Sequence, residues 1–199
     1  DCTHINSSKK VHAKAKYILY AGNPFNKRDL LAPVFESVRA LTNDERKLIK
    51  IIIAGVDVNQ LLRREGVKKD DLLLTKDNIL VLGRVPHSTI EKLYEVCDFS
   101  ILIKPLKKKF SKAGFPTKVS ESMAHGVPPI CNISSDLQLY LNENNSVLID
   151  GDRAENVTLA LKKVISMDEN EVAQMRNAAR KTSRDKLDIN SFVKEVDNF

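Results

Sequence analysis

The sequence predicts an α/β protein with a doubly wound, all-parallel sheet in a single Rossmann-like domain. Six short β-rich runs alternate with amphipathic helical patterns along the chain. Alternating strands and helices joined by right-handed crossovers form doubly wound sheets. The runs are continuous in Val, Ile and Leu, which is typical of strands buried on both faces. In such a sheet, ligands bind beyond the carboxyl ends of the strands.

Each expected strand is a compact apolar run that often ends in Gly, Pro or Asn. The first run is YILYAG, and the second, KIIIAG, has the same ending. The six expected strands lie at 17–22, 50–55, 78–83, 99–105, 128–132 and 146–150.

The expected helices carry apolar residues at helical spacing on one face. Two of them also begin with a capping-box pattern, Ser88-x-x-Glu91 and Ser135-x-x-Gln138. The expected helices lie at 29–41, 88–97, 117–126, 135–143, 154–166, 168–183 and 190–198.

Length and composition fit one folded domain. The chain has 199 residues, of which 42% are hydrophobic and 29% are charged. No apolar run approaches the roughly 18 residues of a membrane-spanning helix. Residues 1–16 are polar and basic without periodicity, so we expect a linker or tail there and the domain over 17–199. The chain begins at Asp1 without a signal peptide, and we expect it to be part of a longer protein.

The charge surplus is modest and basic. Lys plus Arg (32) exceeds Asp plus Glu (26), for a net charge of +6. This favours an anionic partner, whether nucleic acid, a membrane surface or a phosphorylated small molecule, although solvated surface lysines are equally consistent. Aromatic residues make up 6% and are not interleaved with basic ones, which argues against nucleic acid. The lysine-rich run 104–112 is a solvated surface, an anion funnel or a lipid-headgroup contact.

The cysteines and histidines form no recognisable metal or disulfide pattern. Three cysteines are widely spaced without a C-x-x-C motif, and the four histidines lack ligand spacing. We expect Cys97 and Cys131 to be core residues in a reducing compartment, and we expect no metal and no cofactor.

Three of the expected strands end in glycine, at Gly22, Gly55 and Gly83. Glycine permits close approach to a ligand, although each position also suits an ordinary turn. In the segment YAGNPFNKR, Lys27 and Arg28 follow the first glycine and precede a helix, which suits phosphate binding. Neither a P-loop nor G-x-G-x-x-G is present, so P-loop hydrolysis and hydride transfer are disfavoured.

The segment FSKAGFPTKVSESMAHGVPPICN is the most informative. A helix begins near Thr117, and helix N-termini attract anions. Lys118, Glu121 and His125 share one face of this helix, while Val119 faces the sheet. Lys118 would add a full positive charge, and Glu121 could accept hydrogen bonds from a ribose diol. Alternatively, Lys118 and Glu121 form a surface ion pair.

Five segments in order, YILYAG, IIIAGV, NILVLGRVPHSTIEKLYEVCDFSILIKP, GFPTKVSESMAHGVPPI and NNSVLID, resemble the C-terminal, donor-nucleotide-binding domain of GT-B fold glycosyltransferases. More narrowly, they resemble the retaining group 1 family, which uses nucleotide-diphosphate sugars. The resemblance covers residues 17–199. Its most specific string is P-T-K-V-x-E-x-M-A-x-G-x-P at 116–128.

The resemblance implies roles for individual residues, without a bound metal. Lys118 and Glu121 would be the catalytic pair, binding phosphate and ribose respectively. The residues implied in substrate binding are Gly22, Asn23, Lys27, Gly83, Arg84, Thr117 and Val119. Two positions depart from the family pattern: Ala113 replaces the first Glu of E-x7-E, and Asn23 replaces an Arg.

As a whole, the resemblance implies the donor-binding half of a hexosyltransferase in polysaccharide or glycoconjugate biosynthesis. Its partners would be a nucleotide-diphosphate sugar and an N-terminal acceptor domain on the same polypeptide. It implies a cytoplasmic location, with peripheral contact to the inner face of a membrane as an option. The alternatives are a noncatalytic nucleotide-binding module, favoured by Ala113 and Asn23, and a sugar-nucleotide epimerase domain.

Overall fold

The computed structural model describes residues 14–24, 28–107 and 115–188. Lys27, Ala113, the expected helix 190–198 and most of the expected tail therefore lie outside the described residues. Among the described residues, no helix combines the length and the apolar character needed to cross a membrane.

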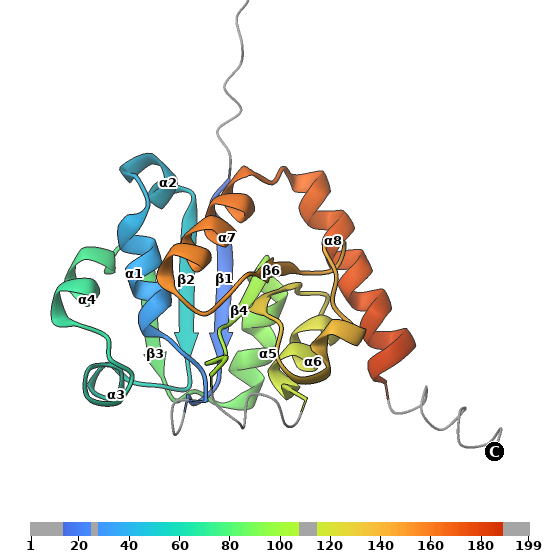
Figure 1. Ribbon diagram of the computed structural model, residues 1–199, viewed down its shortest axis with the longest axis horizontal. Coiled ribbons are helices and arrows are strands. Elements are labelled where there is room, and N and C mark those ends of the chain that lie inside the picture. Colours follow the sequence, from blue (N-terminus) through green and yellow to red (C-terminus); the bar gives the residue numbers. More distant parts are fainter. Residues whose placement is uncertain (1–13, 25–27, 108–114, 189–199) are drawn as a thin grey trace, which may run out of the picture.

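A six-stranded parallel sheet in the order β3-β2-β1-β4-β5-β6 forms the centre of the molecule (Figure 1). Its strands are β1 (Lys16–Ala21), β2 (Ile49–Ala54), β3 (Ile79–Gly83), β4 (Phe99–Leu102), β5 (Pro129–Asn132) and β6 (Val147–Ile149). The order reverses between β1 and β4, as in a doubly wound sheet. The predicted fold class and all six predicted strands are confirmed.

Strand β4 ends at Leu102, three residues before the predicted end at 105. Beyond Leu102 the backbone bonds to a residue of the loop before α1 and to a side chain at the end of β5. The Leu30 amide donates to the Ile103 carbonyl at 2.8 Å, and the Lys104 amide donates to Asn132 Oδ1 at 2.9 Å. These bonds remove the chain from the sheet ladder at the carboxyl edge.

Both faces of the sheet are buried. On β1, Ile18 and Tyr20 join the main core cluster, whereas Leu19 packs with Tyr94 and Cys97 in a second cluster. Helices α1 (Ala32–Ala40) and α7 (Ala154–Ser166) pack against each other, and both contribute side chains to the main core cluster (Figure 1). Helix α5 (His87–Val96) supplies Tyr94 to the second cluster.

The predicted helices at 117–126 and 168–183 are also present. Helix α6 (Thr117–Ala124) contacts β4, β5 and α8, and α8 (Glu169–Thr182) continues into a π-helical turn, η4 (Ser183–Leu187).

Three short helices were not predicted: α2 (Asn43–Lys47), α3 (Val58–Arg64) and α4 (Lys69–Thr75). They bury few side chains, and α2 buries none, so they leave almost no hydrophobic periodicity. Helices α2 and α3 instead begin with capping boxes, Thr42 with Glu45 and Asp57 with Gln60. Those boxes are the signal that would have revealed them.

Both predicted capping boxes are wrong. Helix α5 starts one residue before Ser88, with Pro86 as its N-cap and no side-chain cap. The predicted helix 135–143 is a short 3₁₀ turn, η3 (Ser135–Leu139), also without a side-chain cap. Ser135 there has a φ of 52°, which places it in the left-handed region rather than at a helix N-cap.

Cys97 and Cys131 are buried free thiols, which confirms that they are core residues. Burial raises the pKa of each thiol to about 12, so both stay protonated at neutral pH.

Helix α7 offers a matched test of the core. Leu161 is fully buried, whereas Leu159, on the same helix, is 67% exposed. We expect Leu161→Ala to lower the free energy of unfolding by about 2–5 kcal/mol, because it leaves a cavity. Leu159→Ala should change it by less than about 0.5 kcal/mol. Urea unfolding followed by circular dichroism measures both, and equal losses would contradict this packing.

Candidate functional site

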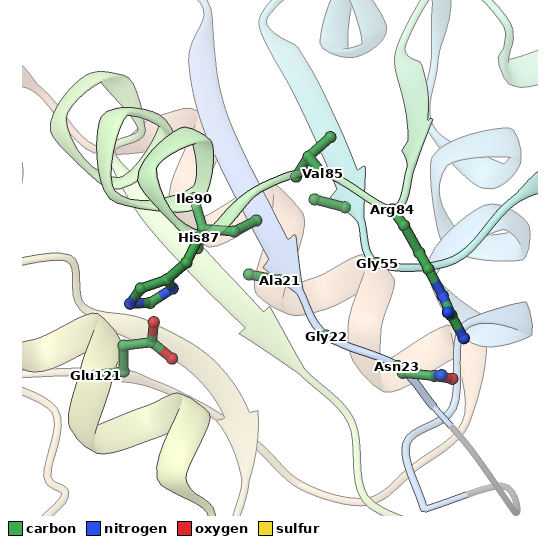
Figure 2. Close-up of a pocket in the computed structure, with 10 residues that line it drawn as sticks. Ala21, Gly22, Asn23, Gly55, Arg84, Val85, His87, Ile90 and Glu121 are labelled. Carbon is green, nitrogen blue, oxygen red and sulfur yellow. The ribbon is translucent and has the colours of Figure 1, made fainter.

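A cavity of about 370 Å³ lies at the carboxyl ends of β1 and β2. The cavity borders β1, one of the two strands at the switch point, where doubly wound folds bind ligands. Figure 2 shows Glu121 and His87 on one side, Asn23 and Arg84 on the other, and the strand ends between them. The lining residues are Ala21, Gly22, Asn23, Ala54, Gly55, Arg84, Val85, His87, Ile90 and Glu121.

The three predicted glycines do lie along one edge of the sheet. The Gly22 amide donates to the Ala54 carbonyl at 2.9 Å, and the Gly55 amide donates to the Gly83 carbonyl at 2.7 Å. A Cβ on Gly55 would lie 2.4 Å from the Gly22 carbonyl oxygen, so the ends of β1 and β2 approach closely. Gly83 has a φ of +69°, and a Cβ on it would meet only Asp57 Cβ, at 4.0 Å, so its backbone conformation rather than close packing favours glycine there.

Gly22 makes room for Lys118. A Cβ on Gly22, which has a φ of +154°, would lie 2.0 Å from Lys118 Cε and 2.7 Å from its Nζ. The lysine side chain therefore crosses directly over the backbone at the end of β1. This explains why a residue from α6 reaches the first strand.

Lys118 reaches a buried carboxylate that the sequence patterns did not reveal. Its Nζ is bonded to Asp29 Oδ2 and lies 5.3 Å from the centre of the Tyr20 ring. Lys104 Nζ donates to the other oxygen, Asp29 Oδ1, at 2.7 Å, and the Tyr20 hydroxyl donates to Oδ2 at 2.9 Å. We call Tyr20, Asp29, Lys104 and Lys118 the Asp29 cluster.

The cluster keeps Asp29 charged. Burial alone would raise the pKa of its carboxyl group, but the charges of Lys118 and Lys104, and their hydrogen bonds, outweigh burial and lower it. Burial and the neighbouring Asp29 carboxylate raise the pKa of Tyr20. The tyrosine therefore stays protonated and acts as a donor to Asp29.

Glu121 lines the cavity from α6, on the same side as His87 at the start of α5 (Figure 2). The alternative of a surface ion pair between Lys118 and Glu121 is not what this structure shows, since Lys118 pairs with Asp29. His125 stacks on Tyr94, with ring centres 4.9 Å apart. The three residues predicted to share a helix face thus have three different surroundings.

The other predicted residues separate into two groups. Asn23, Arg84 and Thr117 are exposed, and the first two line the cavity. Val119 is buried, and its amide donates to the Pro116 carbonyl at 2.9 Å, so it serves the core and the first helical turn. Sequence reasoning missed His87 and Ile90, although both follow Gly83 within one helical turn of the start of α5.

Within residues 14–24, 28–107 and 115–188, no group of three or more His, Cys, Asp or Glu side chains is arranged to hold a metal ion.

Solved structures share this fold at low sequence identity. One match is the C-terminal domain of LpcC, a glycosyl transferase group 1 family protein from Francisella tularensis. The match covers 88% of this chain and 87% of that domain, at 14% identity and a TM-score of 0.69. HepE from Anabaena, solved with UDP, matches at 12% identity and a TM-score of 0.73, over 94% of this chain and 48% of HepE.

Sucrose-phosphate synthase from Thermosynechococcus elongatus matches at 15% identity and a TM-score of 0.71, over 94% of this chain and 45% of the enzyme. This chain therefore spans about half the length of HepE and of the synthase. A search of curated proteins found no match.

A match to a family model identifies the family of this chain. The model described as "Glycosyl transferases group 1" matches residues 4–182, which is most of the chain. This chain belongs to the group 1 glycosyltransferase family and has the fold of a GT-B C-terminal domain.

Proposed function

We propose that this chain is the donor-binding half of a retaining glycosyltransferase that moves a sugar from a nucleotide-diphosphate sugar to an acceptor glycan or lipid. The observation that carries the proposal is Lys118, which reaches from the first turn of α6 across Gly22 at the rim of the cavity. A positive side chain there adds to the partial charge of the helix N-terminus, which attracts phosphate.

The cavity supports a division of roles. Lys118 and the first amides of α6 bind the diphosphate, and Glu121 accepts hydrogen bonds from the ribose hydroxyls. During transfer, negative charge develops on the leaving nucleoside diphosphate, and cations and helix amides already in place stabilise it. HepE has been solved with UDP and with UDP-glucose, which supports a nucleotide-sugar ligand for this fold.

The acceptor site belongs, in this proposal, to an N-terminal domain of the same polypeptide, because the chain spans about half of two structural relatives. The buried free thiols Cys97 and Cys131 support a reducing, cytoplasmic compartment. Assembly of a polysaccharide or glycoconjugate at the inner face of a membrane remains our prediction.

A noncatalytic nucleotide-binding module is the second candidate. Asn23, an exposed neutral side chain, lines the cavity where many family members carry an arginine. Such a module would bind the donor but leave it intact. Transfer or hydrolysis of the bound sugar by the longer polypeptide separates the two candidates.

The first test is a thermal-shift panel of UDP, GDP, ADP and their sugars. A ligand at 100 times its Kd should add about 2.7 kcal/mol of stability. Lys118→Ala should then weaken binding of the preferred diphosphate by about tenfold or more, since a charge-assisted hydrogen bond contributes about 1.5–3 kcal/mol.

The control for Lys118 is Lys47→Ala. Lys47 lies on α2, which precedes β2 and hence belongs to the amino edge of the sheet, and it pairs only with exposed Asp44 in the described structure. Both substitutions remove one positive charge, so a general charge effect would weaken binding equally. Unchanged affinity of the Lys118 variant, measured by calorimetry, would contradict the proposed phosphate contact.

Glu121 has a test of its own. If its carboxylate holds the ribose, the wild-type protein should bind the preferred ribonucleoside diphosphate about tenfold more tightly than the 2′-deoxy analogue. Glu121→Ala should remove most of that difference while leaving binding of the deoxy analogue within about threefold. Equal discrimination in both proteins would place the ribose elsewhere.

A further inference from the structure

We propose that Lys104 is a second phosphate-binding cation and that Asp29 is the positioning residue that holds Lys104 and Lys118 together as one cradle for the diphosphate. This inference rests on the proposed function. It adds Lys104 and Asp29 to Lys118, the residue of α6 to which the family resemblance assigns phosphate binding.

The carboxylate of Asp29 is shared between the two lysines. Its side chain is 1% exposed, and each oxygen accepts from a different ammonium group, Oδ1 from Lys104 at 2.7 Å and Oδ2 from Lys118. The Tyr20 hydroxyl also donates a hydrogen bond to Oδ2, at 2.9 Å. Because both lysines bond to the same small carboxylate, their charges are held side by side.

Lys104 is fixed at its backbone as well as at its tip. Its amide donates to Asn132 Oδ1 at 2.9 Å, and its carbonyl accepts from Asn132 Nδ2 at 2.7 Å. Asn132 is 1% exposed at the end of β5. A buried side chain that satisfies both backbone groups of one residue holds that residue at a defined position.

The cradle lies at the switch point of the sheet. Lys104 follows β4, Tyr20 belongs to β1, and these two strands are neighbours with opposite directions of crossover. The Leu30 amide donates to the Ile103 carbonyl at 2.8 Å and so ties the loop of Asp29 to that of Lys104. Lys118 crosses Gly22, which lines the cavity.

The charge balance points to an anion. Within the Asp29 cluster itself, two lysines share one carboxylate, whereas a structural ion pair would need only one lysine. The Glu65 carboxylate lies outside the cluster but close enough to help raise the pKa of Tyr20, so the positive surplus is that of the cluster alone. Each ammonium has three N–H groups and donates one to Asp29, and the side chains are 17% and 27% exposed, so other donors can reach a ligand. Two ammonium groups with donors left over suit a ligand with several phosphate oxygens, such as a diphosphate.

The test measures binding of inorganic pyrophosphate and of the nucleoside diphosphate preferred in the panel, by calorimetry at several salt concentrations. Lys104→Ala should weaken both ligands by about tenfold and make binding less dependent on salt. Lys104→Arg keeps the charge and should bind within about threefold of wild type. Lys47→Ala, which removes a charge far from the cavity, should bind within about twofold.

Asp29→Asn separates positioning from simple electrostatics. Removing a negative charge beside the site should strengthen anion binding if long-range charge alone matters. If Asp29 positions the two ammonium groups, the variant should bind pyrophosphate about fivefold more weakly instead. Circular dichroism checks that this buried substitution folds, and Lys104→Ala carries the test by itself if it does not.

The outcomes separate the two proposals. If wild type binds neither pyrophosphate nor any nucleoside diphosphate, the proposed function fails and the cradle fails with it. If wild type binds and Lys118→Ala weakens binding while Lys104→Ala does not, the cradle alone is overturned. Tighter binding by Asp29→Asn would likewise overturn the positioning role.

Discussion

The passage of Lys118 over Gly22 is the contact on which the candidate site depends. It requires a residue without a side chain at the end of β1, a helix that begins beside it, and a buried carboxylate to receive the ammonium group. All three are present. A Cβ on Gly22 would lie 2.0 Å from Lys118 Cε, and Asp29 bonds to both Lys118 and the Tyr20 hydroxyl. Without any one of these, the ammonium group of Lys118 would no longer be held at a fixed place beside Gly22.

Most of the fold could be predicted because it depends on local patterns. Buried strands such as β2 are continuous apolar runs, and longer helices such as α7 carry apolar residues at helical spacing. Helices α2 to α4 lack this signal because they bury few side chains. Capping boxes mark α2 and α3, whereas α4 has no side-chain cap. The capping-box patterns at Ser88 and Ser135 predicted the wrong N-caps. The N-cap of α5 is Pro86, and Ser135 has a left-handed backbone conformation.

The site was predictable only in part, for a related reason. Lys118 and Glu121 lie on one helix, and the strand-end glycines mark one edge, so sequence spacing relates them. Asp29 and Lys104 are 75 residues apart, and no pattern in either segment indicates that they meet. Their contact arises from the sheet order, which makes β1 and β4 neighbours. The side chain of Val119 packs in the core, so its place in the motif also has a packing role.

The central claim is that the diphosphate of a nucleotide lies at the start of α6, against Lys118 and the Gly22 turn. A crystal structure of this chain with its preferred nucleoside diphosphate tests that most directly. The account predicts phosphate oxygens within hydrogen-bond distance of Lys118 Nζ, with Glu121 at the ribose. A nucleotide bound away from the carboxyl edge of β1 and β4, with Lys118 touching only Asp29, would contradict it.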